Sequence, residues 1–463
     1  MMLTLRPHTH TPPLLHKACL KLLGLLILPL AASGAQAGPD IQHWTLESGT
    51  HVYFVESRAL PLLDIQVDFA AGSAHDPADK AGLAAMTLAL LETGVEGLDE
   101  QHIADRLADT GAQLGSGADN DRTGLTLRTL SSPDERDAAI ALLSRLLASP
   151  SFPQAALERE RARYVAGLRD ALTRPGTLAA RAFETALYPR HPYGLQSTEE
   201  TLLAIQRDDV VAFHRQHFTA SQATVSIVGD ASREEADAIA RQLTGALPQG
   251  QALPPLPAPE PPEQGVQRIP HPSAQAHVLI GLPVMSREDP DYYPLLVGNY
   301  VLGGGGFVSR LTTEVREKRG FAYSVYSAMI PRKVSGPFQI GLQTRGAQAE
   351  AALEVVDAVL RAFIAEGPSE TELQAARDNI INGFGLRLDS NRKMLDHVAM
   401  IGFYRLPLDW LDAYPQQVAQ VTAEAVRDAF ARRVTPAHLV TVVAGGDGDA
   451  GDTGDAGAGG PAQ

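Results

Sequence analysis

Residues 302–325 read LGGGGFVSRLTTEVREKRGFAYSV, and this stretch contains the most specific pattern in the chain. It opens with four consecutive glycines, which are Gly303, Gly304, Gly305 and Gly306. Ser309 follows, a residue type that caps helices, then a charged segment with Arg316, and Tyr323 seven residues later. No Gly-Lys-Ser/Thr follows the glycines, so the run does not match a nucleotide phosphate loop. Two expectations stay open for the glycines: a flexible lip where a peptide enters, or a plain tight turn.

Strand and helix patterns are mixed along the chain. Apolar residues alternate with polar ones in residues 63–69, which predicts a strand buried on one face. Ser132-Pro133-Asp134-Glu135 then opens a helix, with a cap residue, a proline in the first turn and acids near its positive end. Runs of strands and runs of helices, in place of strict alternation, favour an α+β fold with helices on one face of a largely antiparallel sheet.

The chain also contains a weak internal repeat with a period of about 216 residues. The segment from Thr219 to Asp230 has the same features as the segment from Thr435 to Asp447, and a helical stretch precedes each of them. Duplication of one α/β unit explains this match economically, and a chance likeness of two edge strands is the alternative. Between the halves, residues 252–265 read ALPPLPAPEPPEQG, which is typical of an extended spacer. We therefore expect domains at 38–250 and 267–445, a linker at 251–266 and a Gly/Ala/Asp tail at 446–463.

The first 37 residues have the features of a secretory signal peptide. Basic residues precede an apolar run, and Ala35-Gln36-Ala37 fits the small-x-small cleavage pattern. An uncleaved membrane anchor is the alternative, but Pro29 interrupts the run. Cys19, the only cysteine of the chain, lies in this segment, so the exported protein would form no disulfide. The formal charge of −15 argues against nucleic acid or anionic lipid as a partner. We expect a periplasmic protein without a membrane anchor.

Several stretches together resemble the pitrilysin and mitochondrial processing peptidase family of metallopeptidases. They are residues 63–77, Lys80-Ala81-Gly82-Leu83-Ala84, His191-Pro192-Tyr193-Gly194 and, above all, residues 302–325. The resemblance extends over nearly all of the mature chain. It implies an α+β fold with two homologous peptidase-like domains, each a largely antiparallel sheet with helices packed on it, which together form half of a clam-shell chamber.

The zinc-binding residues of that family are missing from this sequence. Active members carry His-x-x-Glu-His on a helix, where two histidines four residues apart hold zinc and the glutamate takes a proton from the bound water. On this chain the motif corresponds to Ala85, Leu88 and Ala89, and the distant glutamate ligand to Ala166 or Gly167. We expect no metal on this chain and an apolar helix at 83–91 that fills the former site as core.

The resemblance implies a role for Arg316 and Tyr323. In the family, this pair comes from the half opposite the zinc and reaches the substrate backbone. A guanidinium and a phenol can both donate hydrogen bonds to the oxygen that gains charge during peptide hydrolysis. The alternative is that Arg316 is a solvated charge on a helix and Tyr323 an ordinary aromatic residue of a strand.

The histidines offer weaker candidates. His214 and His217 lie three residues apart near the end of a predicted helix, but no Asp, Glu or Cys follows beside them. We expect them to be exposed helix-terminal residues, with metal binding as the alternative. His191 belongs to the His-Pro-Tyr-Gly turn and is expected to be structural.

The sequence therefore predicts a non-catalytic subunit of a divided periplasmic zinc peptidase. A homologous partner would supply zinc, water and general base, while this chain would contribute Arg316 and Tyr323, with the glycines Gly303 to Gly306 at the peptide entrance. This chain would bind no cofactor itself and would be inactive alone. The alternative is a stand-alone peptide-binding or scaffold protein on a degenerate peptidase fold.

Overall fold

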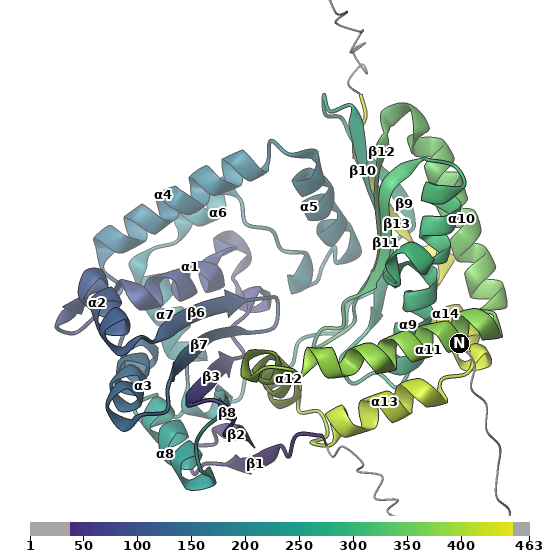
Figure 1. The fold of residues 1–463 in the computed structure, drawn as a ribbon. Helices are drawn as coiled ribbons and strands as arrows, with labels where there is room; N and C mark the ends of the chain where they lie inside the picture. Colours follow the sequence, from purple (N-terminus) through teal and green to yellow (C-terminus); the bar gives the residue numbers. More distant parts are fainter. Residues whose placement is uncertain (1–37, 448–463) are drawn as a thin grey trace, which may run out of the picture. The chain divides into compact units, whose positions relative to one another are not determined.

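The computed structural model describes residues 38–447 (Figure 1). The predicted signal segment 1–37 and residues 448–463 of the predicted tail lie outside the described residues. The first sheet contains six strands in the order β1-β2-β8-β3-β7-β6. They are β1 (Gln42–Thr45), β2 (His51–Glu56), β3 (Leu62–Phe69), β6 (Gln113–Ala118), β7 (Thr123–Leu130) and β8 (Thr224–Gly229). A separate two-stranded ladder consists of β4 (Gly94–Val95) and β5 (Leu98–Asp99).

The second sheet contains five strands in the order β11-β12-β10-β13-β9. They are β9 (Gly265–Ile269), β10 (Gln275–Met285), β11 (Ala322–Met329), β12 (Gly336–Arg345) and β13 (Val440–Gly445). Each sheet contains one parallel pair, β2 with β8 and β9 with β13. All other neighbouring strands are antiparallel, four pairs in the first sheet and three in the second. The mixed but largely antiparallel α+β fold predicted from the sequence is confirmed.

The helices follow the same order in the two halves of the chain. The first half contains α1 (Leu83–Leu90), α2 (Glu100–Thr110), α3 (Pro133–Ala148), α4 (Gln154–Ala171), α5 (Pro175–Leu187), α6 (Glu199–Ala204), α7 (Arg207–His217) and α8 (Arg233–Thr244). The second half contains α9 (Tyr292–Asn299), α10 (Ala349–Glu366), α11 (Glu370–Phe384), α12 (Asn391–Tyr404), α13 (Trp410–Gln420) and α14 (Ala423–Arg433). Five helices precede the last main strand in each half, α3 to α7 before β8 and α10 to α14 before β13. This match supports duplication of one unit.

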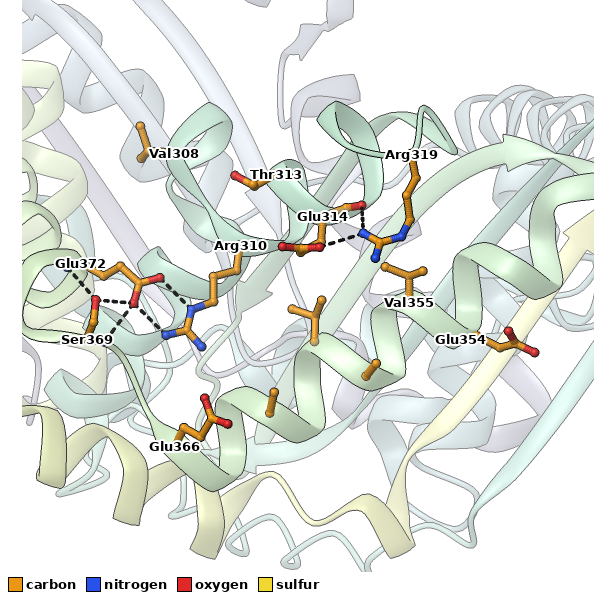
Figure 2. Close-up of a pocket in the computed structure, with 13 residues that line it drawn as sticks. Val308, Arg310, Thr313, Glu314, Arg319, Glu354, Val355, Glu366, Ser369 and Glu372 are labelled. Carbon is orange, nitrogen blue, oxygen red and sulfur yellow. Dashed lines mark hydrogen bonds and ion pairs between the residues drawn. The ribbon is translucent and has the colours of Figure 1, made fainter.

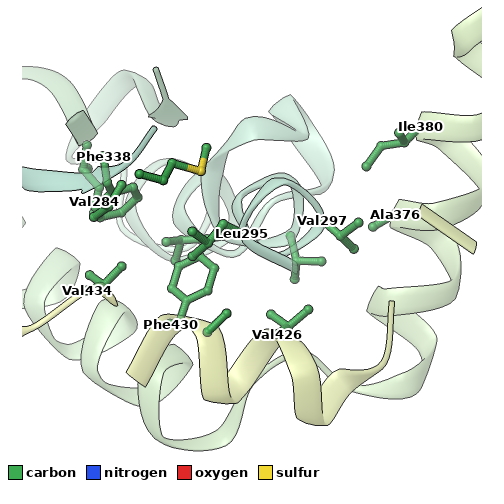
Figure 3. Packing of buried hydrophobic residues seen from close by; sticks show 14 of the residues in the cluster. Val284, Leu295, Val297, Phe338, Ala376, Ile380, Val426, Phe430 and Val434 are labelled. Atoms are coloured by element: carbon green, nitrogen blue, oxygen red, sulfur yellow. The ribbon is translucent and has the colours of Figure 1, made fainter. Parts of the chain in front are cut away.

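Each sheet receives a helix from the opposite half of the chain. Helix α5 packs against β13 and β10 of the second sheet, and α12 packs against β8, β3 and β2 of the first. These helices occupy corresponding places in the two halves, so the exchange is reciprocal. Part of the second sheet's core lies among α9, α11 and α14, where Leu295, Val297, Ala376, Ile380 and Phe430 interdigitate (Figure 3).

The prediction that β3 is buried on one face only was wrong. Both faces are covered, and the polar face contains the buried carboxylates of Asp64 and Asp68. Arg128 donates to Asp64 at 2.8 Å, and Arg122 donates to Asp68 at 3.1 Å. Helix α12 is the reason, because it lies over this face. Burial raises the pKa of Asp68 to about 6, against the opposing effect of Arg122.

Candidate functional site

Arg316 and Tyr323, the predicted pair, lie against each other. Arg316 belongs to a single π-helical turn, Thr312–Glu317, and Tyr323 is the second residue of β11. The guanidinium carbon lies over the phenol ring at 4.8 Å from its centre. Tyr323 is 84% exposed, so its hydroxyl is open to solvent. Their spacing of seven residues does not by itself require a contact. In the structure, the two side chains meet at the surface.

A third residue, Phe307, completes this cluster. Its ring centre lies 4.9 Å from the guanidinium carbon of Arg316, and its side chain is 70% exposed. Phe307 is not among the site residues predicted from the sequence. The available signal was its position directly after the glycine run, where a bulky aromatic residue follows four residues without side chains.

The charges next to Arg316 are paired among themselves. Lys318 and Arg319 each donate to Glu314 at 2.7 Å. Arg310 forms a two-pronged ion pair with Glu372 at 2.7 Å, which together with the Ser369 cap lowers the pKa of Glu372 to about 2. Within residues 38–447, no ion pair or hydrogen bond occupies the guanidinium of Arg316. Its N–H groups are therefore available to a ligand.

The segment that carries Arg316 borders a groove with a volume of about 720 Å³ (Figure 2). Apolar residues of α10 line one wall, with Val308 opposite and the Arg310–Glu372 ion pair at one end. Arg310 also donates to the carbonyl of Gly367 at 3.0 Å. These bonds hold the Arg316 segment to the start of α11, so the position of Arg316 is anchored from outside the site.

The four glycines have distinct structural tasks. A Cβ on Gly303 would lie 2.4 Å from the backbone nitrogen of Ser327 in β11, so only glycine fits there. Gly306 has a φ of +62°, which favours glycine, and it opens the turn Gly306–Val308. Gly304 and Gly306 are exposed, whereas Gly303 is buried. A role of these glycines in peptide binding stays a prediction.

The three former zinc positions lie on α1. The prediction that the helix at 83–91 packs as core is confirmed, since its leucines and Met86 are buried, but the prediction that it fills the former site is wrong. Leu83, Met86 and Leu90 are buried as core, but Ala85 and Ala89 are only half-buried. Together with Leu88 they line a pocket of about 610 Å³, called here the α1 pocket. Alanine methyl groups are too small to fill this space. The residues present do not fit a zinc ion, and within the described residues no three potential ligands gather elsewhere.

Helix α4 forms another wall of the α1 pocket. Glu160, Arg163 and Tyr164 line it, and the Tyr164 hydroxyl donates to the carbonyl of Ala85 at 3.2 Å. Glu160 accepts from Arg163 at 2.7 Å. Gly167 lies one helical turn after Tyr164 and two turns after Glu160, on the same face of α4. Of the two candidates, Ala166 and Gly167, it is therefore the better match to the missing glutamate ligand. The half-buried Glu92 also lines the pocket, and burial raises its pKa, with Glu100 adding to the effect.

His214 and His217 are structural, and the expectation that they are exposed was wrong. Both are buried near the end of α7. His214 bonds the carbonyl of Leu147 through Nε2 at 2.8 Å, and His217 bonds the carbonyl of Ala70 through Nδ1 at 3.1 Å. The two rings therefore face different partners and do not share a metal face. The ring of His75 lies 4.9 Å from that of His217.

We expect His217 to make stability depend on pH. Burial, with a smaller contribution from His75, lowers the pKa of His217 to about 4. The unfolded chain binds a proton near pH 6.5, so the folded state loses stability as the pH falls from 6.5 to 4. Between pH 7 and pH 5, wild type should lose about 2 kcal/mol more than His217→Gln, as measured by urea unfolding. Replacement of the exposed His102 by glutamine serves as control, and an equal pH dependence in His217→Gln would contradict this assignment.

The His-Pro-Tyr-Gly turn is structural, as predicted for His191. Nδ1 of His191 accepts a hydrogen bond from the backbone nitrogen of Tyr193 at 3.1 Å. Nε2 of His191 bonds the carbonyl of Pro257 in the proline-rich segment. The hydroxyl of Tyr193 donates to the buried Asp121, which also accepts from Tyr404 at 2.9 Å. Asp121 therefore joins the first sheet to α12 of the second half.

No helix of residues 38–447 is long and apolar enough to cross a membrane.

Comparisons with known proteins agree with this geometry. Residues 204–380 match the family described as "Peptidase M16 inactive domain". The chain is 36% identical to a crystal structure from Pseudomonas fluorescens described as a peptidase M16 inactive domain, with a TM-score of 0.84, covering 88% of this chain and 97% of that one. It is 26% identical over 399 residues to the "Non-peptidase homolog YmxG" of Helicobacter pylori, covering 85% of this chain and 91% of the relative.

A more distant neighbour shares the fold alone. The periplasmic protease PqqL of Escherichia coli is 19% identical, with a TM-score of 0.74, and the match covers 88% of this chain and 45% of that one. The predicted resemblance to the inverted-motif metallopeptidases is thus confirmed. With a relative 36% identical along nearly its whole length and no metal ligands on α1, this chain belongs to the M16 peptidase family, as one of its non-catalytic members.

Proposed function

We propose that this chain is the substrate-binding subunit of a two-chain zinc peptidase that cleaves peptides in the periplasm. A homologous partner carrying His-x-x-Glu-His would supply the zinc, the attacking water and the general base. This chain would form half of the chamber and present Arg316 and Tyr323 to the peptide bound by the partner. The observation that carries the proposal is the coexistence of a helix α1 without ligands and an accessible Arg316–Tyr323 pair.

The chemistry of the pair supports this role. Peptide hydrolysis at zinc generates negative charge on the carbonyl oxygen, and donors aimed at that oxygen stabilise the transition state. Among the described residues, no partner occupies the N–H groups of Arg316, and the side chain of Tyr323 is exposed. A donor pair of this kind has no reaction to assist on this chain alone, since nothing on α1 activates water. A partner is therefore needed for the pair to act.

The names of two relatives support a division of labour. The Helicobacter pylori relative is called a non-peptidase homolog, whereas the Mycobacterium leprae relative, 26% identical over 400 residues, is called an uncharacterized zinc protease. Chains of one fold thus carry both kinds of name. Under this proposal, a catalytic and a non-catalytic chain of the family would close one chamber between them.

The test is co-purification of the full-length protein, tagged at its C-terminus, from its native periplasm. We expect a homologue with an intact His-x-x-Glu-His to elute in about a one-to-one ratio. Zinc analysis should find the metal in that partner, and the eluate should cleave unstructured peptides until a chelator removes the zinc. A lone chain without zinc or activity would contradict the proposal and favour a stand-alone peptide-binding protein.

A further inference from the structure

The turn that carries Phe307 is fixed at both of its ends. On one side, Gly303 lies directly against the backbone of Ser327 in β11. On the other side, the buried Ser309 donates from its hydroxyl to the carbonyl of Gly306 at 2.7 Å, and its backbone nitrogen donates to the same carbonyl at 3.1 Å. The left-handed backbone of Gly306 then directs the chain into Phe307. The position of this ring is thus built into the fold.

The ring of Phe307 lies against the guanidinium of Arg316. Single exposed apolar side chains are common on protein surfaces, so exposure alone carries no argument. The argument rests on the contact with Arg316. The guanidinium carbon of Arg316 lies over the rings of Phe307 and Tyr323, at 4.9 and 4.8 Å from their centres. Of the three arginines in residues 310–319, Arg310 and Arg319 form ion pairs with glutamates, and Arg316 forms none among the described residues. The aromatic rings take the place of an acid.

This replacement matters for what Arg316 can bind. A carboxylate partner would occupy the N–H groups and cancel the charge. Aromatic rings attract the flat faces of a guanidinium through their quadrupole, and they leave its in-plane N–H groups free. An arginine held in this way keeps its full positive charge and a restricted orientation. It suits an acceptor oxygen that approaches in the plane of the guanidinium, such as a peptide carbonyl.

We propose that Phe307 is a positioning residue, which holds Arg316 in the orientation that receives the carbonyl oxygen of the peptide substrate. This proposal rests on the function proposed above. It also assigns a purpose to the glycine run, since Gly303 and Gly306 allow the chain to place the ring over Arg316. Phe307 acts through Arg316 and does not itself contact the reacting atoms.

The activity test uses the purified two-chain enzyme with variants at residue 307. Phe307→Ala should lower kcat/KM by about 3- to 30-fold, mainly through kcat, because a cation–π contact of this type contributes that much. Phe307→Leu keeps the apolar bulk but lacks the ring, and should lose as much. Phe307→Tyr should retain activity. Val308→Ala is the matched control, since Val308 is 74% exposed on the same turn and is not over Arg316.

A double-mutant cycle separates positioning from a direct role. In an Arg316→Ala background, Phe307→Ala should cause no further loss, because the residue it positions is gone. The proposal would be overturned by additive losses in the cycle or by full activity of Phe307→Leu. A rise in KM that depends on the substrate would also overturn it, because Phe307 would then be part of a subsite for a substrate side chain. If Arg316→Ala leaves activity unchanged, the proposed function fails and the positioning role fails with it.

An NMR measurement on this chain alone tests the positioning role of Phe307 separately from the proposed function. The Nε–H NMR signal of Arg316, identified by its disappearance in Arg316→Lys, should carry a ring-current shift from the aromatic residues. Phe307→Ala should move that signal, whereas Val308→Ala should leave it in place. An unmoved signal in Phe307→Ala would overturn the positioning role even if the two-chain enzyme and the effect of Arg316→Ala stand.

Discussion

Replacement of Arg316 by alanine should lower the kcat/KM of the two-chain peptidase by about 100- to 1000-fold, the loss that accompanies removal of one donor to an oxyanion. The guanidinium has free N–H groups among residues 38–447, so it can donate to the substrate oxygen as the proposed function requires. Steady-state cleavage of an unstructured peptide by the reconstituted pair measures the effect. The stability of this chain should change little, since the substitution breaks no ion pair or hydrogen bond among residues 38–447.

Arg319→Ala provides the matched control for this experiment. Arg319 lies three residues further along the same segment, but its guanidinium donates to the side chain of Glu314 at 2.7 Å and to its carbonyl at 2.8 Å. Exposed ion pairs of this kind contribute little, so we expect a change of less than about fivefold. A nearly unchanged rate in Arg316→Ala, or an equal loss in Arg319→Ala, would contradict the assigned role of Arg316.

Local patterns in the sequence were sufficient for many individual elements. Pro133 marked the start of α3, because a fixed proline φ acts within one turn. Ser132 holds the N-cap position, but its hydroxyl donates to the side chain of Glu135 and caps no backbone N–H. The repeat of residues 219–230 at 435–447 marked β8 and β13, which occupy equivalent places in the two sheets. The Arg316–Tyr323 pair was found through a family motif, since nothing in its local pattern distinguishes it from a solvated helix charge and a strand aromatic.

The exchange of α5 and α12 between the sheets could not be predicted in this way. Asp64 and Asp68 look like the solvent-facing residues of a half-buried strand, and only a helix more than 300 residues later covers them. Arg128 on β7 and Arg122 just before that strand pair with these carboxylates, and local periodicity does not specify the strand pairing that brings them there. The contact of Phe307 with Arg316 was missed for a similar reason, because a turn between them decides whether two residues nine apart meet.

The α1 pocket leads to the second large prediction, that zinc binding can be rebuilt on this chain. Ala85 and Ala89 lie four residues apart on one face of α1 and line an open pocket of about 610 Å³, so two histidines have room there. A Cβ on Gly167 meets no atom within 4 Å, and Gly167 continues the α4 face formed by Glu160 and Tyr164. We expect Ala85→His/Leu88→Glu/Ala89→His/Gly167→Glu to retain about one zinc ion per chain after dialysis, whereas wild type retains none.

Metal analysis of the dialysed protein, with circular dichroism to verify folding, checks this expectation. The same variant without Gly167→Glu is the control, and it should bind zinc much more weakly because it lacks the third ligand. A folded quadruple variant that retains no zinc would contradict the geometry of the α1 pocket. If the variant retains zinc, this chain lacks a metal site because of the side chains on α1 and α4, and not because of how these helices are placed. The backbone of the catalytic half would then persist in a chain whose Arg316 and Tyr323 are proposed to serve a site on the partner.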